Sequence, residues 1–230
     1  MLRIREPQKI LFLYATTAIV IARTPVKVRY RYFSRVIGDK FALYMLAARR
    51  KMEPKVISLG ELKIIGLSYY GDNKNQEIGQ KWDEFNKKWR EYKKLYTIRI
   101  EKHCQIGTIQ EFKTGNLKDA SYQIGEVFPG WCGNMDMKAG NFEYICGMLV
   151  EDYGEIPQDF VKKTIPMRKY LVFTHKGKLN TLMDTYNYIY GLWLPKSDIK
   201  VSDDFNMEWY DNRFNIDQDS SEFDILVPIK

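Results

Sequence analysis

VISLGELKIIGLSYYGDNKNQEIGQKWDEFNKKWREY runs from Val56 to Tyr92 and combines a strand pattern with the clearest helical pattern in the chain. Its first part, Val56 to Tyr70, is rich in β-branched and aromatic residues, which predicts a strand with a bulge near Gly60 or Gly66. After the turn residues Gly71-Asp72-Asn73, apolar side chains recur at intervals of four, three, four and three: Ile78, Trp82, Phe85, Trp89 and Tyr92. This period predicts an amphipathic helix that packs on the core.

The rest of the chain repeats this order of elements. A loop with one short strand is expected from Lys94 to Ala120, and a loop from Pro129 to Gly140. A second helix is expected where Leu182, Tyr186, Ile189 and Trp193 share one face, before Leu194-Pro195. The further predicted strands are Tyr122–Phe128, Phe142–Asp152, Lys169–Lys176, Phe205–Tyr210 and Phe223–Ile229.

This order predicts an α+β fold made of two strand–helix–strand–strand halves with pseudo-twofold symmetry. Such halves form an antiparallel sheet with two helices on one face. A ligand cleft is expected between the halves, because pockets favour the junctions of substructures.

The charge divides the chain into two parts. The net charge is +7, but thirteen Lys and Arg against three acidic residues give residues 1–55 a charge of +10, which leaves −3 for the remaining 175 residues. Residues Phe41 to Arg50 are good helix formers, and Glu53-Pro54 breaks that pattern. We therefore expect a basic N-terminal segment at 1–51 and a separate domain at 52–230. The basic segment predicts a weak contact with an anion such as DNA.

Several function classes find no support in the sequence. Three cysteines without a CxxC spacing indicate a reducing, cytoplasmic location, and two histidines are too few to suggest a zinc site, so no metal is expected. The apolar run Ile10 to Ala22 is too short to cross a bilayer, and the basic residues that follow it argue against an export signal. No phosphate-binding, dinucleotide or common hydrolase motif occurs, so no cofactor is expected.

Ordered blocks from Met52 onward resemble the GyrI-like family, which also supplies the effector-binding domain of AraC-type and MerR-type multidrug regulators. The resemblance covers about 175 residues and lies in MEPKVISLGELKIIGLSYYG (52–71), FEYICGMLVED (142–152), KYLVFTHKG (169–177), YNYIYGLWLP (186–195), MEWYDNRF (207–214) and FDILVPIK (223–230). It implies a domain that binds hydrophobic, often cationic aromatic compounds, and it places an acidic residue in the penultimate strand at Glu208.

The strand pattern around Glu208 agrees with that role. Alternate residues of a strand share a face, so Asn206, Glu208 and Tyr210 face one side while Phe205, Met207 and Trp209 face the other. We expect the apolar side to pack under the helices and the polar side to meet the ligand. The pattern alone favours Glu208 as an exposed sheet residue or a partner of Arg213, and only the resemblance reverses that preference. The resemblance suggests these aromatic ligand contacts: Tyr69, Trp131, Tyr144, Tyr190, Trp193 and Tyr210.

Two other functions are compatible with the same blocks. Some family members resemble hydrolases that open strained rings in cytotoxic compounds, and Glu208 with Tyr144 or Tyr210 could provide the acid–base pair. A third possibility is a protein that inhibits a topoisomerase by direct contact. Residues 1–51 loosely resemble the end of an AraC-type helix-turn-helix and suggest a truncated remnant or a basic arm. His175, before Gly177, is expected at the surface; the oligomeric state is left open.

Overall fold

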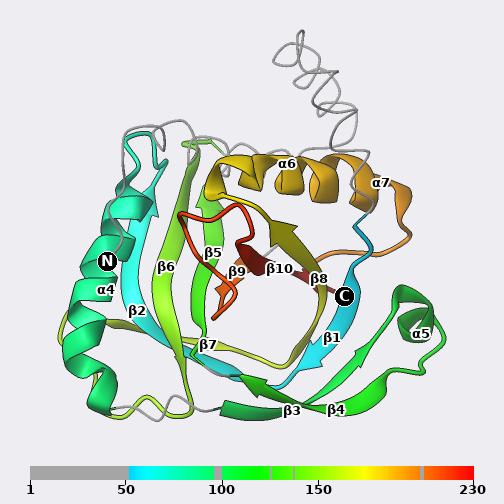
Figure 1. Cartoon of the computed structure of the whole chain (residues 1–230), viewed down its shortest axis with the longest axis horizontal. Coiled ribbons are helices and arrows are strands. Elements are labelled where there is room, and N and C mark those ends of the chain that lie inside the picture. Colours follow the sequence, from blue (N-terminus) through cyan, green and yellow to red (C-terminus); the bar gives the residue numbers. More distant parts are fainter. Residues whose placement is uncertain (1–51, 96–99, 125, 137, 203–204) are drawn as a thin grey trace, which may run out of the picture.

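A single curled sheet of ten antiparallel strands dominates the computed structural model, which describes residues 52–95, 100–124, 126–136, 138–202 and 205–230 (Figure 1). The strands are β1 (Lys55–Leu59), β2 (Leu62–Gly71), β3 (Ile100–Gly107), β4 (Lys118–Ile124), β5 (Phe128–Asp136), β6 (Asn141–Val150), β7 (Val161–Ile165), β8 (Arg168–Lys176), β9 (Phe205–Tyr210) and β10 (Glu222–Ile229). The helices are α4 (Glu77–Tyr92), α5 (Ile109–Lys113), α6 (Leu182–Tyr186) and α7 (Leu194–Lys196), with a π-helix, η4 (Asn187–Trp193), and short 3₁₀ turns η2 (Lys93–Leu95) and η3 (Leu179–Thr181).

The strand order confirms the predicted α+β fold with two similar halves. Across the sheet the strands run β4-β3-β1-β8-β10-β9-β5-β6-β2-β7. One half is β2, α4, β5 and β6, and the other is β8, α6–η4, β9 and β10. In each half the strand before the helix is outermost, the last strand lies in the middle, and the remaining strand lies innermost. The halves therefore meet where β5 pairs with β9, a junction we call the seam.

Both main helices cover the same face of the sheet, as predicted. Cys146 of β6 pairs with Gly130, Gly130 pairs with Glu208, and Glu208 pairs with Ile225, so these residues share one face. Cys146 belongs to the apolar cluster under α4, and Ile225 to the cluster under α6–η4. Figure 1 shows α4 and the α6–α7 segment along two sides of the curled sheet.

The opposite face of the sheet forms its own apolar core because the sheet curls. Its cluster takes residues from nine of the ten strands and from Val127, and it includes Trp131, Tyr170, Met207 and Trp209. The predicted alternation in β9 is correct, but the orientation is reversed. Phe205, Met207 and Trp209 fill this second core, whereas the Asn206–Glu208–Tyr210 side faces the helices.

Four predicted segments differ from the structure. The strand expected at Tyr122–Phe128 covers only the end of β4 and the first residue of β5. The long first strand is two strands, β1 and β2, separated at Gly60-Glu61. The loop expected after α4 contains β3, α5 and β4, which extend one end of the sheet. The loop expected at 129–140 is largely strand β5, which lies at the seam. Its glycines and proline lower strand propensity, but pairing with β6 and β9 on both sides outweighs that preference.

The start of α4 is fixed by side-chain hydrogen bonds. The Asn73 Oδ1 accepts from the backbone N–H of Ile78 at 3.0 Å, which satisfies a donor in the first turn. The Tyr69 hydroxyl in turn accepts from the backbone N–H of Asn73 at 2.8 Å. Tyr69 therefore connects the end of β2 to the helix that follows it.

His175 is buried, and the expectation of a surface position was wrong. Its ring is fully enclosed, lies 2.8 Å from the Thr185 hydroxyl and packs on Phe223. The pattern before Gly177 could not reveal this, because α6 supplies the covering residue from ten positions away.

No helix in the described part of the chain is long and apolar enough to cross a membrane. The segment predicted at 1–51 lies outside the described residues.

Candidate functional site

Glu208 lies in the middle of β9 at the seam, on the face that the helices cover. Its backbone pairs with Gly130 of β5 and with Ile225 of β10. Only 5% of the residue is exposed. A carboxylate at this depth needs strong partners, because an uncompensated buried charge is costly.

Three tyrosine hydroxyls supply those partners. Tyr144 of β6 and Tyr210 of β9 each donate to Glu208 Oε2 at 2.8 Å, and Tyr186 of α6 donates to Oε1 at 2.8 Å. The donors come from both halves of the fold, so the cluster joins the halves across the seam. No Lys or Arg among the described residues forms an ion pair with Glu208. The carboxylate therefore has hydroxyl partners but no cationic partner there.

Gly130 makes room for the Tyr144 hydroxyl. Tyr144 pairs with Cys132 rather than with Gly130, so its hydroxyl must reach diagonally across β5 to meet Glu208. A Cβ atom on Gly130 would lie 1.9 Å from the Tyr144 hydroxyl oxygen and 3.3 Å from Glu208 Oε2. The site therefore requires glycine at this position, because any side chain would occupy the space of the Tyr144 hydroxyl.

Helix α4 adds an aromatic wall. The Trp82 indole Nε1 donates to the Tyr144 hydroxyl at 3.4 Å, and the indole meets the Tyr210 ring edge-on with 5.6 Å between centroids. Trp82 and Tyr210 are both half-buried, whereas Glu208, Tyr144 and Tyr186 are buried. Among these side chains, the two that reach the solvent are therefore Trp82 and Tyr210.

Burial controls the ionisation of the cluster. It raises the pKa of Glu208 above the usual value, and the three tyrosine hydrogen bonds oppose that rise. Burial and the neighbouring Glu208 charge hold the pKa values of Tyr144, Tyr186 and Tyr210 well above the usual value. The tyrosines are therefore neutral donors at neutral pH, and any negative charge of the cluster resides on Glu208.

Four of the predicted residues lie on the helix-covered side of the sheet, the side that Glu208 faces. Tyr144 and Tyr210 contact Glu208 directly. Tyr69 pairs with Tyr144 on the neighbouring strand and shares its face. Tyr190 of η4 stacks on Tyr186, with ring centroids 6.1 Å apart and planes 11° apart, and receives a hydrogen bond from Asn206.

Trp131 is separated from this cluster. It pairs with Met207, so its side chain lies on the face opposite to Glu208, where it packs on Phe205 and beneath the Lys163 ammonium. The prediction placed it in a loop, and the misassigned strand β5 explains the difference.

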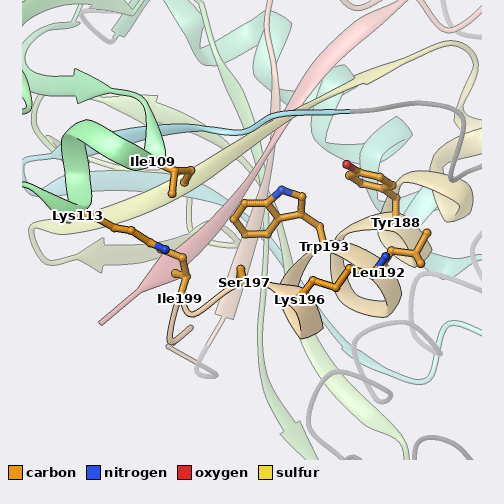
Figure 2. A pocket seen from close by; sticks show the side chains of 8 residues that line it. All are labelled: Ile109, Lys113, Tyr188, Leu192, Trp193, Lys196, Ser197 and Ile199. Carbon is orange, nitrogen blue, oxygen red and sulfur yellow. The ribbon is translucent and has the colours of Figure 1, made fainter.

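Trp193 is also directed elsewhere. It lines a pocket of about 370 Å³ between α5 and the η4–α7 segment, together with Tyr188, Leu192 and Ile109 (Figure 2). The predicted helical face joined Tyr186 to Trp193. Because η4 is a π-helix, it contains more residues per turn than an α-helix, and the two side chains leave the helix in different directions.

Tyr186 was assigned to the core by its helical period and was missed as a site residue. The signal that could have identified it is its spacing of four from Tyr190, which places both rings on one face of a helix. Periodicity alone cannot show that the hydroxyl of a core tyrosine meets a buried carboxylate.

Comparison with known proteins identifies the domain. A family model described as the GyrI-like small molecule binding domain matches residues 52–230. The transcriptional regulator BrlR of Pseudomonas aeruginosa is 25% identical over 181 residues, which cover 78% of this chain and 56% of that protein. The chain thus spans about half the length of this curated relative.

Two solved structures share the fold. SAV2435 bound to tetraphenylphosphonium superposes with a TM-score of 0.54 at 16% identity, covering 78% of this chain and 94% of that one. EcmrR in a complex with DNA superposes with a TM-score of 0.52 at 14% identity, covering 93% of this chain and 76% of that one. The match to the family model agrees with this shared fold.

Proposed function

This chain belongs to the GyrI-like small-molecule-binding family, and we propose that its Glu208 cluster binds the positive charge of a hydrophobic aromatic cation. The observation that carries the proposal is a buried carboxylate that no cationic side chain of the described residues neutralises. Its partners are neutral hydroxyls, which solvate the charge without cancelling it. A cation from outside the protein supplies the opposite charge.

The surroundings of Glu208 favour an aromatic cation over a small ion. Rings of Tyr144, Tyr186, Tyr210 and Trp82 lie around the carboxylate, and aromatic faces attract cations by about 0.5–2 kcal/mol each. Apolar ligand groups gain further from contact with these rings. The tetraphenylphosphonium bound to SAV2435 has this chemistry and supports the choice of ligand class.

Ligand entry requires the cluster to open. Glu208 is enclosed in the structure, so at least one tyrosine hydroxyl must give up its bond when a cation approaches. Tyr210 is the best candidate because it is half-buried, whereas Tyr144 and Tyr186 are buried. Its bond to Glu208 is replaced by the attraction between the carboxylate and the cation.

We propose that this binding serves as an effector signal. BrlR is a transcriptional regulator, and EcmrR was solved in a DNA complex. The basic segment 1–51 precedes the domain and suits contact with an anionic partner. Sequestration of a toxic cation is compatible with the same site and needs no DNA contact.

A thermal-shift comparison tests the proposal. Tetraphenylphosphonium and triphenylphosphine oxide present similar phenyl groups, but only the first is charged. A ligand at 100 times its dissociation constant stabilises a protein by about 2.7 kcal/mol, which for a domain of this size raises the melting temperature by roughly 5–10 °C. We expect that rise with the cation and a much smaller one with the oxide; equal shifts, or none with the cation, contradict the proposal.

One observation favours a second candidate function. The Tyr144 and Tyr210 hydroxyls each lie 2.8 Å from Glu208 Oε2, within the range that general acid–base catalysis requires. This geometry suits hydrolysis of an epoxide. Glu208 accepts a proton from water, the water oxygen bonds to a ring carbon as the ring carbon–oxygen bond breaks, and a tyrosine hydroxyl protonates the released oxygen. Glu208 then returns its proton to that tyrosine. Two results together would favour the hydrolase. The wild type would turn over an aryl epoxide but fail to bind tetraphenylphosphonium, and Glu208→Gln would abolish the turnover.

A further inference from the structure

We infer that Asn206 is a second polar contact in the Glu208 site and selects aromatic cations that carry an N–H donor. The inference rests on the proposed cation-binding function and specifies the class of ligand. Asn206 is only 3% exposed and lies two residues before Glu208 on β9. Alternate residues share a face, so both side chains leave the strand on the side of α6–η4.

Only half of the Asn206 amide is used by the protein. Its Nδ2 donates to the Tyr190 hydroxyl at 3.5 Å. Its Oδ1 is buried and has no hydrogen-bond partner within the described ranges of the chain. Nearly all buried polar atoms are paired in folded proteins, and leaving an acceptor unpaired costs free energy. A ligand donor is the partner that its position beside Glu208 favours.

Two matching contacts run side by side across this part of the molecule. Tyr186 bonds to Glu208, and Tyr190 bonds to Asn206. The two tyrosine rings are stacked, and their separation of 6.1 Å is close to the spacing of about 6.7 Å between alternate residues of a strand. The site therefore presents a charged acceptor and a neutral acceptor one strand repeat apart.

This spacing defines the ligand. A flat cation with its charge at Glu208 and an amino group several ångströms away satisfies both acceptors at once. Quaternary phosphonium and ammonium ions can use only Glu208. We therefore expect aminoaromatic cations to bind more tightly than cations of similar size that lack N–H groups.

A matched pair of dyes tests the inference. Both dyes carry their charge on a protonated acridine ring, so they share the ring N–H. Proflavine adds two amino groups with N–H donors, and in acridine orange both amino groups are fully methylated. Asn206→Leu removes the acceptor but keeps a side chain of similar size. Titration of the wild type and the variant with each dye, followed by fluorescence, gives four dissociation constants. Tetraphenylphosphonium, titrated by calorimetry into both proteins, gives two more and shows that the variant is folded.

We expect Asn206→Leu to weaken the binding of proflavine about five- to tenfold, which is the effect of losing one hydrogen bond. Acridine orange and tetraphenylphosphonium should change less than about twofold. Equal weakening of both dyes, or no weakening of proflavine, overturns the inference, because Asn206 then acts through packing or makes no ligand contact. If the Leu variant does not fold, Asn206→Ala gives the same comparison. If the wild type binds none of the three cations, the proposed function itself is overturned.

Discussion

Gly130 shows how the absence of a side chain determines a polar site. The Tyr144 hydroxyl occupies the space above this glycine, and a Cβ there would lie 1.9 Å from it. Gly130→Ala must therefore displace Tyr144 from Glu208. We expect a loss of about 1–3 kcal/mol in the free energy of unfolding, typical of an overpacked core, and weaker binding of tetraphenylphosphonium.

Gly60→Ala is the matched control for that substitution. A Cβ on Gly60 meets no atom within 4 Å, so the same chemical change leaves the site intact. Denaturant unfolding and ligand titration of both variants make the comparison. Equal stability and equal affinity in the two variants would show that Tyr144 does not depend on the space above Gly130.

Glu208 should make the stability of the ligand-free protein depend on pH. Burial raises its pKa in the folded state, so the folded protein holds this proton more tightly than the unfolded chain. The stabilisation is complete below the usual glutamate pKa of about 4.3 and is lost as pH rises through the raised value. Glu208→Gln removes this dependence.

The free energy of unfolding of the Gln variant should therefore improve relative to the wild type as pH rises from about 4 to about 8. Urea unfolding at several pH values measures the difference. A difference that stays constant over this range would mean that Glu208 ionises as an exposed carboxylate does.

Helix α4 uses two tryptophans for two purposes. Trp82 is half-buried and reaches Tyr144 and Tyr210, while Trp89 is buried and stacks on Phe85 in the core. The helical period identified both as core residues. Their positions on the helix are seven apart, so they share a face at different depths relative to the seam.

Substitution of each tryptophan by Phe should separate these purposes. Trp82→Phe removes the donor to Tyr144 and should lower tetraphenylphosphonium affinity several-fold, at a cost of about 0.5–1.5 kcal/mol in stability. Trp89→Phe should lower stability and leave affinity unchanged. Titration and thermal melting of both variants check the prediction, which is wrong if the affinity loss follows Trp89.

The success of each sequence prediction depended on how much of the element's burial is visible in its own residues. The long helix, β8, β9 and β10 were predicted within one or two residues, because their patterns depend on a buried face that persists along the element. Strand β5 was missed because its Gly- and Pro-rich sequence is stabilised by neighbours on both sides. Glu208 was found through the family resemblance, whereas Tyr186 became a site residue only when the two halves were joined.

The site exists because the two halves meet. Tyr144 belongs to the first half, and Tyr186, Glu208 and Tyr210 belong to the second, so neither half contains the full cluster. Helix α4 packs on β2 and β6 of the first half, and its Trp82 reaches Tyr210 of the second half. A cation bound at Glu208, as we propose, would touch both halves and would alter how they fit together.

The binding of tetraphenylphosphonium to wild type and Glu208→Gln, measured by isothermal titration calorimetry, tests the central claim most directly. Gln keeps the size of the side chain and removes its charge. Charge-assisted hydrogen bonds and close charge contacts are worth roughly 1.5–3 kcal/mol, so we expect about ten- to a hundredfold weaker binding by the variant. The neutral triphenylphosphine oxide should bind both proteins equally. Wild-type affinity of a folded Gln variant for the cation would contradict the account, because the charge of Glu208 would then contribute nothing to binding.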